Sequence, residues 1–355
     1  MGFLKRVFRV LVIFIVILFL VYWFGPQVDK PNLDTSLPAV SSNLMELQKQ
    51  IDTREAAMDD IKPDNQARIV WFDSIPTKTP YSIVYLHGWS ASQGEGSPLH
   101  MDTAKKYGCN LYLPRLAGHG LEEAEPMLDL TADALITSAK EAIAVGKQLG
   151  EKVILMSTST GCTLALHLAQ EDKDIAGILL YSPNIAIFDP NATLLSKPWG
   201  LQLARMVKGG DYHISESTEE EKKYWTSKYR VEALTHLQVL VDETMKPETF
   251  EKIDQPIFMG YFFKNDSIQD KVVSVPAMLE MYDQLGTADA LKRKVAFPDV
   301  DNHVIASYMT SKDLESVRKE TYAFLEEILE LKPKPPMMEK DSILSNPEKE
   351  PMESL

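Results

Sequence analysis

The chain has 355 residues, of which 45% are apolar and 25% are charged. This balance is typical of a globular protein and argues against a mostly disordered or wholly membrane-embedded chain. The formal net charge of −14 predicts a body that repels nucleic acid, so a nucleic-acid partner is not expected. The length allows one large core with additional segments rather than several domains.

The amino-terminal segment combines a basic flank with an apolar run. Lys5, Arg6 and Arg9 precede an uninterrupted apolar stretch over residues 10–24, which ends in aromatic residues. A basic flank, an apolar run and an aromatic end predict a transmembrane anchor over residues 1–26. The positive flank then places the amino terminus in the cytoplasm and the catalytic body on the extracytoplasmic side of the membrane. A cleaved signal peptide is the alternative, although no small-residue cleavage site follows the run.

Two further segments differ in composition from the body. Residues 27–65 are polar and contain several prolines, with one mildly helical stretch at 44–58, and are predicted to be a linker. Residues 332–355 hold five prolines and many charges without apolar periodicity, which predicts a disordered tail. The body is therefore expected over residues 66–331.

Within the body, short apolar runs alternate with helical patterns, which is typical of a mainly parallel sheet with helices on both faces. Residues about 185–252 break this alternation and are predicted to form an inserted helical cap. The predicted strands cover residues 67–72, 82–86, 110–113, 152–156, 175–181, 257–263 and 292–297. The predicted helices cover residues 131–149, 160–170, 276–285 and 312–331.

A candidate nucleophile lies where the predicted strand 152–156 runs into a helix. The intervening residues are Ser157, Thr158, Ser159, Thr160 and Gly161. A sharp strand-to-helix turn that exposes a nucleophilic serine needs small residues two before and two after it, which favours Ser159 over Ser157. The alternative is a polar loop that only caps the next helix, a role for which Ser and Thr are well suited.

A second loop, after the predicted strand 82–86, carries His87, Gly88 and Trp89. A tetrahedral intermediate of acyl transfer concentrates negative charge on one oxygen, and two fixed backbone N–H groups stabilise it. We assign these oxyanion-hole donors to the backbone N–H groups of Trp89 and Thr160.

A histidine and an acid follow the nucleophile in the order that a serine hydrolase of this architecture uses. His303 comes after the last predicted strand and is the candidate general base. The loop after the strand 257–263 offers two carboxylates, Asp270 and Asp266, and Asp270 is preferred as the acid that orients His303. Asp266 stays open as the alternative.

Neither a cofactor nor a metal ion is expected. Cys109 and Cys162 are the only cysteines, both fall in segments that read as core, and no metal-type spacing of Cys and His occurs. We expect two free thiols.

With these residues in place, the region 67–331 resembles the α/β-hydrolase-fold lipases and carboxylesterases, especially their monoacylglycerol-lipase-like branch. The loop 113–120, Leu-Pro-Arg-Leu-Ala-Gly-His-Gly, looks like the loop after the fourth strand of that group. The resemblance implies an eight-stranded sheet, no cofactor, and acyl transfer through a covalent acyl-enzyme. Ser157 stands where the motif of the family has glycine.

The expected activity is hydrolysis of a small or medium acyl ester. Apolar cap residues could line a substrate pocket or merely pack the cap: Leu194, Leu195, Trp199, Leu201 and Leu203. Amide or peptide hydrolysis by the same triad is one alternative, and a non-catalytic binding protein on the same fold is another. A binding protein would have no physical need for Ser159, Asp270 and His303 together.

Overall fold

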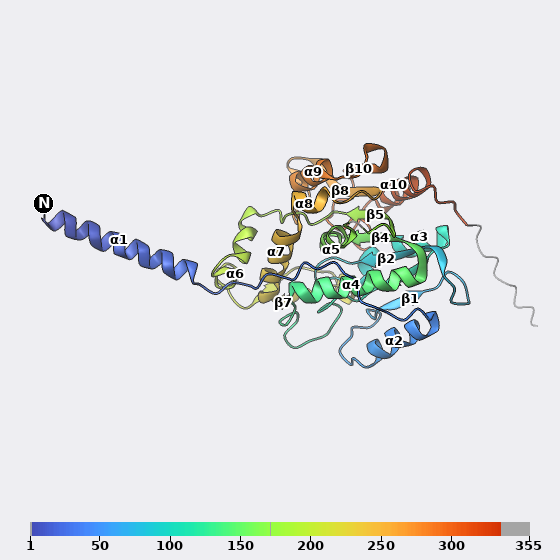
Figure 1. The fold of residues 1–355 in the computed structure, drawn as a ribbon, viewed down its shortest axis with the longest axis horizontal. Helices are drawn as coiled ribbons and strands as arrows, with labels where there is room; N and C mark the ends of the chain where they lie inside the picture. Colours follow the sequence, from blue (N-terminus) through green and yellow to red (C-terminus); the bar gives the residue numbers. More distant parts are fainter. Residues whose placement is uncertain (1, 171, 335–355) are drawn as a thin grey trace, which may run out of the picture.

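An eight-stranded sheet forms the centre of the molecule in the computed structural model, which describes residues 2–170 and 172–334. The strands follow the order β1-β3-β2-β4-β5-β8-β10, and β9 pairs with β8 (Figure 1). The pairings are parallel except those of β1 with β3 and of β8 with β9. The strands are β1 (Arg68–Val70), β2 (Thr79–Leu86), β3 (Asn110–Leu113), β4 (Gly150–Thr158), β5 (Ile175–Tyr181), β8 (Ile257–Asn265), β9 (Ile268–Gln269) and β10 (Lys292–Phe297).

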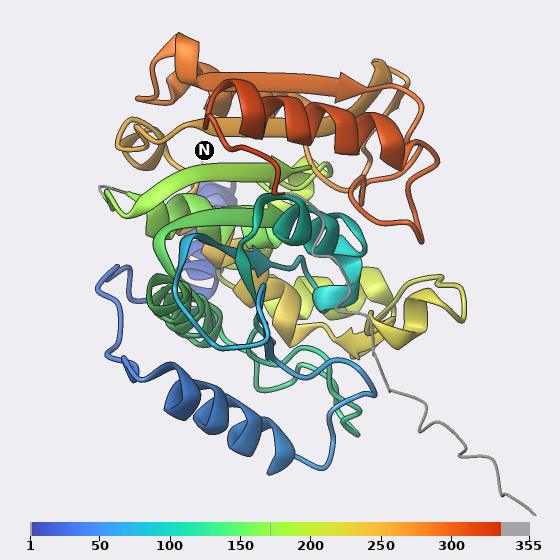
Figure 2. The same cartoon turned by 90° about the vertical axis from the view of Figure 1, so that its right-hand side faces the viewer.

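Helices cover both faces of this sheet (Figure 2). In β2, Val84 and Leu86 pack in one layer with helices α4, α5, α7 and α9, whereas Ile83 and Tyr85 pack in the other with α3 and α10. Both faces are therefore buried, as parallel sheets require. The helices are α1 (Gly2–Trp23), α2 (Leu44–Ala56), α3 (Leu99–Tyr107), α4 (Ala132–Leu149), α5 (Thr160–Ala169), α6 (Gly200–Lys208), α7 (Glu232–Thr244), α8 (Pro247–Phe250), α9 (Val275–Gln284) and α10 (Leu314–Glu327).

These elements confirm the predicted fold class. Each of the seven predicted strands coincides with a strand of the sheet, and β3, β5 and β10 have the predicted bounds. The four predicted helices correspond to α4, α5, α9 and α10, whereas α3 was not predicted. Cys109 and Cys162 are buried and unpaired, as expected.

The insert between β5 and β8 is not purely helical, which corrects the predicted cap. It contains a two-stranded antiparallel sheet of β6 (Tyr212–Ile214) and β7 (Lys228–Arg230) beside α6. Helix α7 buries Val239 and Leu240 in the core cluster of the sheet, so this part of the insert is a layer of the body. The backbone N–H of Thr226 donates to the carbonyl of Ser90, which places the insert beside the loop that follows β2.

Residues 27–66, here called the strap, pack along the body instead of forming the predicted linker. Helix α2 lies at the predicted helical stretch, and its Leu47 and Ile51 are buried in the core cluster. Before α2, the Asn32 N–H donates to the Asp133 carboxylate 2.7 Å away. The linker prediction followed the polar composition, but apolar side chains four residues apart give α2 one face that packs against the body.

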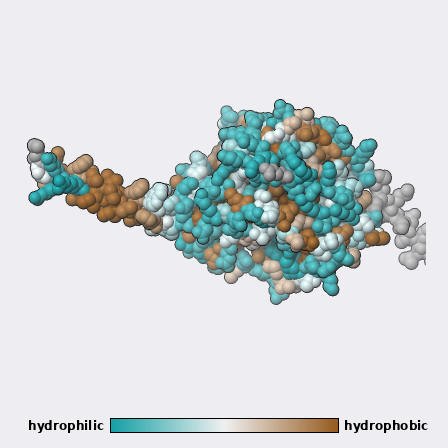
Figure 3. Space-filling view, in the orientation of Figure 1, coloured by the Kyte–Doolittle hydropathy of each residue, from teal (hydrophilic) through white to brown (hydrophobic). Residues whose placement is uncertain are grey.

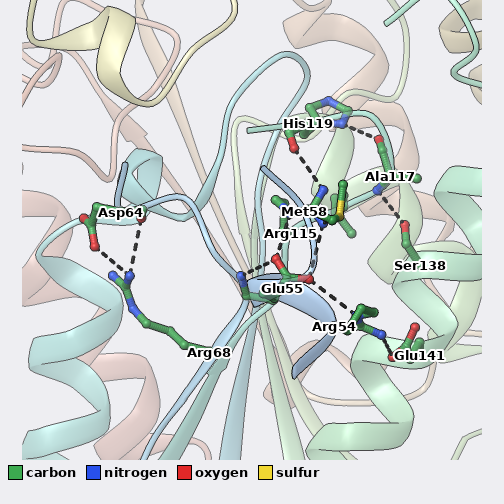
Figure 4. Close-up of polar contacts among 12 residues, drawn as sticks. Arg54, Glu55, Met58, Asp64, Arg68, Arg115, Ala117, His119, Ser138 and Glu141 are labelled. Atoms are coloured by element: carbon green, nitrogen blue, oxygen red, sulfur yellow. Dashed lines mark hydrogen bonds and ion pairs between the residues drawn. The ribbon is translucent and has the colours of Figure 1, made fainter. Parts of the chain in front are cut away.

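A buried ion pair fixes the end of α2 (Figure 4). The Arg115 guanidinium lies 2.8 Å from the Glu55 carboxylate, and the two side chains are only 8% and 4% exposed. Glu55 also accepts a hydrogen bond from the Ala67 N–H at 3.0 Å. Glu55 therefore joins the strap, the loop after β3 and the start of β1 at one point.

Helix α1 extends away from the body, and none of its residues is buried (Figure 1). Its apolar side chains form a continuous brown surface between a hydrophilic end and the body (Figure 3). Among residues 2–170 and 172–334, no helix has both the length and the apolar character required of a bilayer-crossing segment. The predicted transmembrane anchor is thus not confirmed.

The end of α1 is attached to the insert through Trp199. The Trp199 indole N–H donates to the carbonyl of Val21 at 2.9 Å, and its backbone N–H donates to the carbonyl of Pro26 at 2.7 Å. Trp199 is also the residue that precedes helix α6. At the other end of the chain, residues 335–355 of the predicted tail lie outside the described residues.

Candidate active site

Ser159 occupies a strained turn between β4 and α5. Its backbone has φ 52° and ψ −116°, a conformation that residues other than glycine rarely adopt. The Ser159 N–H donates to the Tyr181 carbonyl at 3.0 Å, and the Ser159 carbonyl accepts from the Asn184 N–H at 3.1 Å. These bonds to the end of β5 hold the turn in the geometry of a nucleophile elbow.

The residues two before and two after Ser159 explain why this turn requires small side chains. A Cβ atom on Gly161 would lie 2.0 Å from the Leu86 carbonyl oxygen, so only glycine fits. On the other side, the Ser157 hydroxyl is fully buried and donates to the Leu179 carbonyl at 3.1 Å. Ser157 therefore takes part in the packing of β4 against β5, and Ser159 is the serine at the turn.

His303 and Asp270 meet at the same edge of the sheet. His303 lies in the loop after β10, and its Nδ1 is 2.6 Å from the Asp270 carboxylate. The second oxygen of Asp270 accepts hydrogen bonds from the N–H groups of Val272 and Val273. The carboxylate is thus held by three donors, with no exposure to solvent.

The alternative acid lies elsewhere. Asp266 is exposed in the turn between β8 and β9, and the Gln269 side chain donates to its backbone carbonyl. No hydrogen bond joins the Asp266 carboxylate to a histidine in the described part of the chain. The structure therefore brings Asp270, and not Asp266, to His303.

The pair has opposite pKa shifts. Burial alone would raise the pKa of Asp270, but the charge and hydrogen bond of His303 and the two valine N–H groups outweigh burial and lower it. Burial would lower the pKa of His303, but the Asp270 charge and hydrogen bond, with a further contribution from the Glu95 charge, raise it. The arrangement favours an imidazolium beside a carboxylate, which is the ion pair a general base forms when it accepts a proton.

The loop after β2 approaches Ser159 closely. A Cβ atom on Gly88 would lie 3.1 Å from the Ser159 Cβ, so the two turns are in contact. Trp89 follows Gly88 in this loop, and Thr160 is the first residue of α5, where backbone N–H groups have no helical partner. Within residues 2–170 and 172–334, neither the Trp89 N–H nor the Thr160 N–H donates a hydrogen bond to the chain. Both N–H groups are therefore available as hydrogen-bond donors.

A carboxyl group that the sequence analysis did not select lies beside this loop. Glu95 is 1% exposed, and its carboxylate accepts a hydrogen bond from the Gly88 N–H at 2.6 Å. The only signal in the sequence is that it lies between two glycines shortly after the His-Gly-Trp motif. Elsewhere in the described residues, no cluster of three or more His, Cys, Asp or Glu side chains could hold a metal ion.

The predicted pocket-lining residues of the insert do not converge on this site. Leu194 and Trp199 are exposed, and Trp199 contacts the end of α1. Leu201 lines a small hollow together with Pro26 and Val28. Trp199 and Leu201 therefore pack the insert against the start of the strap, which favours the packing alternative for these two residues.

Comparison with known proteins gives the same class as the fold and the site. Residues 83–320 match the model of the alpha/beta hydrolase family, so the chain belongs to this family. It is 27% identical over 194 residues to the thermostable monoacylglycerol lipase of Bacillus sp. (strain H-257), a match that covers 55% of this chain and 72% of that protein.

Solved structures of the same fold have little sequence identity with this chain. A structure from work on the metagenome-derived lipolytic enzymes LipS and LipT has a TM-score of 0.60 at 17% identity, covering 75% of this chain and 99% of that one. The monoacylglycerol lipase of Paleococcus ferrophilus has a TM-score of 0.53 at 14% identity, covering 74% of this chain and 98% of that one. At such identities these likenesses concern the fold.

Proposed function

We propose that this protein is a serine hydrolase that cleaves carboxylic esters through an acyl-enzyme on Ser159. The observation that carries the proposal is the strained turn at Ser159, because a serine at positive φ between a strand and a helix is typical of a nucleophile elbow, and the loop of Gly88 contacts this turn. The relative from Bacillus, a monoacylglycerol lipase by name, supports an acyl ester as the substrate class.

The residues then act in a defined order. His303 accepts the hydroxyl proton of Ser159 while the serine oxygen bonds to the acyl carbon, and the Trp89 and Thr160 N–H groups stabilise the oxyanion. The imidazolium gives its proton to the leaving alcohol, which departs and leaves the acyl-enzyme. A water molecule then attacks the acyl carbon while His303 takes its proton. The bond between the acyl carbon and the Ser159 oxygen breaks, the imidazolium returns the proton to that oxygen, and the acid departs. Asp270 holds the Nδ1 tautomer of His303 throughout.

The test is labelling of the full-length protein with a fluorophosphonate probe. We expect the wild type to be labelled at Ser159, and Ser159→Ala and His303→Ala to lose labelling. Ser157→Ala is the matched control, because its hydroxyl is bonded inside the core, and this variant should still be labelled. A folded wild-type protein that takes no label would overturn the proposal and favour a binding role.

The acyl preference can be measured next. A panel of nitrophenyl esters of increasing acyl length, with matched nitroanilides, separates ester from amide hydrolysis. We expect turnover of the esters and at least about tenfold slower turnover of the anilides, since the amine is the poorer leaving group. Faster hydrolysis of the anilides would instead favour the amide-hydrolase alternative.

We also propose that α1 attaches the protein to a membrane. The support is the continuous apolar surface over residues 10–23 of a helix with no buried residue. A basic flank of Lys5, Arg6 and Arg9 favours the cytoplasmic side for the amino terminus and the opposite side for the body.

A further inference from the structure

Among the residues that the structure describes, no Lys or Arg side chain forms an ion pair with the buried Glu95 carboxyl. One of its oxygens accepts hydrogen bonds from the Gly88 N–H at 2.6 Å and from the Tyr85 hydroxyl at 3.1 Å. The Tyr85 hydroxyl is in turn 3.0 Å from the hydroxyl of Thr158, the residue before Ser159. A buried carboxyl without an ion-pair partner is costly, which calls for a functional reason.

The turn that carries Glu95 is tightly packed on both sides of this residue. Glu95 belongs to the 3₁₀ helix Gln93–Gly96, and the glycines on either side of it pack against rings. A Cβ atom would lie 2.3 Å from the Tyr224 ring at Gly94, and 2.5 Å from the Tyr85 ring at Gly96. The turn is thus held between the insert and β2, with the carboxyl directed at the loop after β2.

Glu95 lies across Gly88 from the nucleophile. A Cβ atom on Gly88 would lie 2.7 Å from the second carboxyl oxygen of Glu95 and 3.1 Å from the Ser159 Cβ. The Glu95 charge also acts on His303, whose charge acts on Glu95 in return. The buried Glu95 carboxyl therefore contacts the loop after β2, residues 87–89, here called the oxyanion loop. Its charge also raises the pKa of His303.

We propose that Glu95 is a positioning residue for the hydrolysis, an inference that rests on the proposed function. Its carboxylate fixes the Gly88 N–H and thereby orients the Trp89 N–H toward the oxyanion. Its charge also stabilises the imidazolium of His303. Asp270 stabilises the same imidazolium through Nδ1. The imidazolium that forms during attack is then stabilised by two carboxylates, of which Glu95 is the one that also holds the oxyanion loop.

The titration of Glu95 fits this role. Burial raises its pKa to about 7, although the Gly88 N–H, the His303 charge and the Tyr85 hydroxyl oppose the shift. Other titratable groups near this cluster are His100, whose ring packs at the edge of the Tyr85 ring, and the Cys162 thiol on α5. The carboxyl is ionised above about pH 7, so its negative charge is present there to stabilise the imidazolium that His303 forms on accepting a proton.

Three full-length variants test the inference. Glu95→Gln keeps the size of the side chain and removes its charge, and Glu95→Ala removes the acceptor as well. Glu55→Gln is the matched control, since Glu55 is equally buried and accepts a backbone hydrogen bond but lies at the strap. Rates of ester hydrolysis are measured against pH and normalised to the fluorophosphonate-reactive enzyme.

A neutral residue at position 95 should lower the pKa of His303, because a nearby negative charge raises it. We therefore expect the acid limb of kcat/KM to move to lower pH by about half a unit or more in both Glu95 variants. We expect kcat to fall less than about tenfold in Glu95→Gln and about 10- to 100-fold in Glu95→Ala. Both losses are smaller than the loss expected when an oxyanion-hole donor is removed, and KM should change little.

A second readout uses thermal unfolding of Glu95→Gln. Because the pKa of Glu95 is raised to about 7 from an ordinary value of 4.5, the folded wild type loses stability as pH rises through that interval. The Tm of Glu95→Gln relative to wild type should therefore increase from pH 5 to pH 8. Glu55→Gln should lower Tm and leave the acid limb in place.

Two outcomes overturn the inference, and both differ from failure of the proposed function. An active wild type whose Glu95 variants keep kcat and the acid limb would show that Glu95 has no part in the reaction. If folded Glu95→Gln contains less fluorophosphonate-reactive enzyme but the acid limb of its kcat/KM profile is not shifted, the role of Glu95 is structural alone. Failure of the proposed function, by contrast, is an unlabelled and inactive wild type. If Glu95→Ala does not fold, Glu95→Gln decides.

Discussion

Two acidic residues on one short hairpin have opposite environments. Asp270 has no exposure and contacts His303, whereas Asp266, four residues earlier, is exposed in the β8–β9 turn. Burial in a low-dielectric site strengthens the interaction of Asp270 with the imidazolium, and solvent screens Asp266. The same chemical group is therefore expected to matter at one position and to be dispensable at the other.

Exchange of each acid for its amide tests this difference. Asp270→Asn should lower kcat by about 10³- to 10⁴-fold, because asparagine favours the wrong tautomer of His303 and no longer stabilises the imidazolium. Since the Asp270 charge raises the pKa of His303, the acid limb of the residual activity should move to lower pH. Asp266→Asn is the control and should retain wild-type rates; a reversal of the two results would make Asp266 the acid.

Reactive groups in loops after strands could be predicted from the sequence, but the Glu95 contact could not. Ser159 follows the apolar strand β4 and His303 follows the last strand of the parallel sheet, so their place at one edge of the sheet follows from the chain order. A glutamate normally indicates a surface position, and its burial depends on rings from β2 and the insert that are distant in sequence. No local pattern records such packing.

At the scale of secondary structure, the strands were predictable because burial on both faces leaves continuous apolar runs in the sequence. The small elements of the insert were not, because strands of three residues such as Tyr212–Ile214 carry no periodicity. The strap was predicted to be a linker because few of its side chains are apolar. Its attachment depends on two apolar side chains of α2 and one buried carboxylate, within a segment that is otherwise polar.

The ion pair of α2 should be important for stability. Glu55→Gln leaves the buried Arg115 without a charged partner, and breaking a buried pair typically costs about 3 to 5 kcal/mol of unfolding free energy. The matched control is Arg68→Met, which removes the i,i+4 pair with Asp64, where the side chains are 35% and 52% exposed (Figure 4). That change should cost no more than about 1 kcal/mol.

Urea denaturation at neutral pH measures both variants. Equal small losses would mean that the Glu55 site is solvated in solution and that the strap is loosely attached. A large loss only in Glu55→Gln would establish the strap as a part of the folded body.

At the scale of the whole molecule, the contrast between α1 and the body is the main feature. The body has a hydrophilic surface with scattered apolar residues, whereas α1 exposes apolar side chains continuously over residues 10–23 (Figure 3). An uncovered apolar surface of this extent is costly in water, so a covering phase or partner is expected.

Membrane attachment can be tested by flotation of the full-length protein with lipid vesicles. We expect the wild type to float, and a variant with Ile13→Asp and Ile17→Asp to remain in the dense fraction, because each charge opposes burial in hydrocarbon. Ile75→Asp is the control, since Ile75 is equally exposed but lies in the loop between β1 and β2. Flotation of the double variant would contradict attachment through α1.

Trp199 attaches the end of α1 to the insert. It bonds to the carbonyls of Val21 and Pro26 and directly precedes α6, so it is the first attachment of the chain after α1. A mechanical pull or tilt applied to α1 is therefore transmitted to the insert before it reaches the sheet. The insert also contacts the loop after β2 through the hydrogen bond of the Thr226 N–H to the Ser90 carbonyl, so α1 and that loop are attached to the same insert.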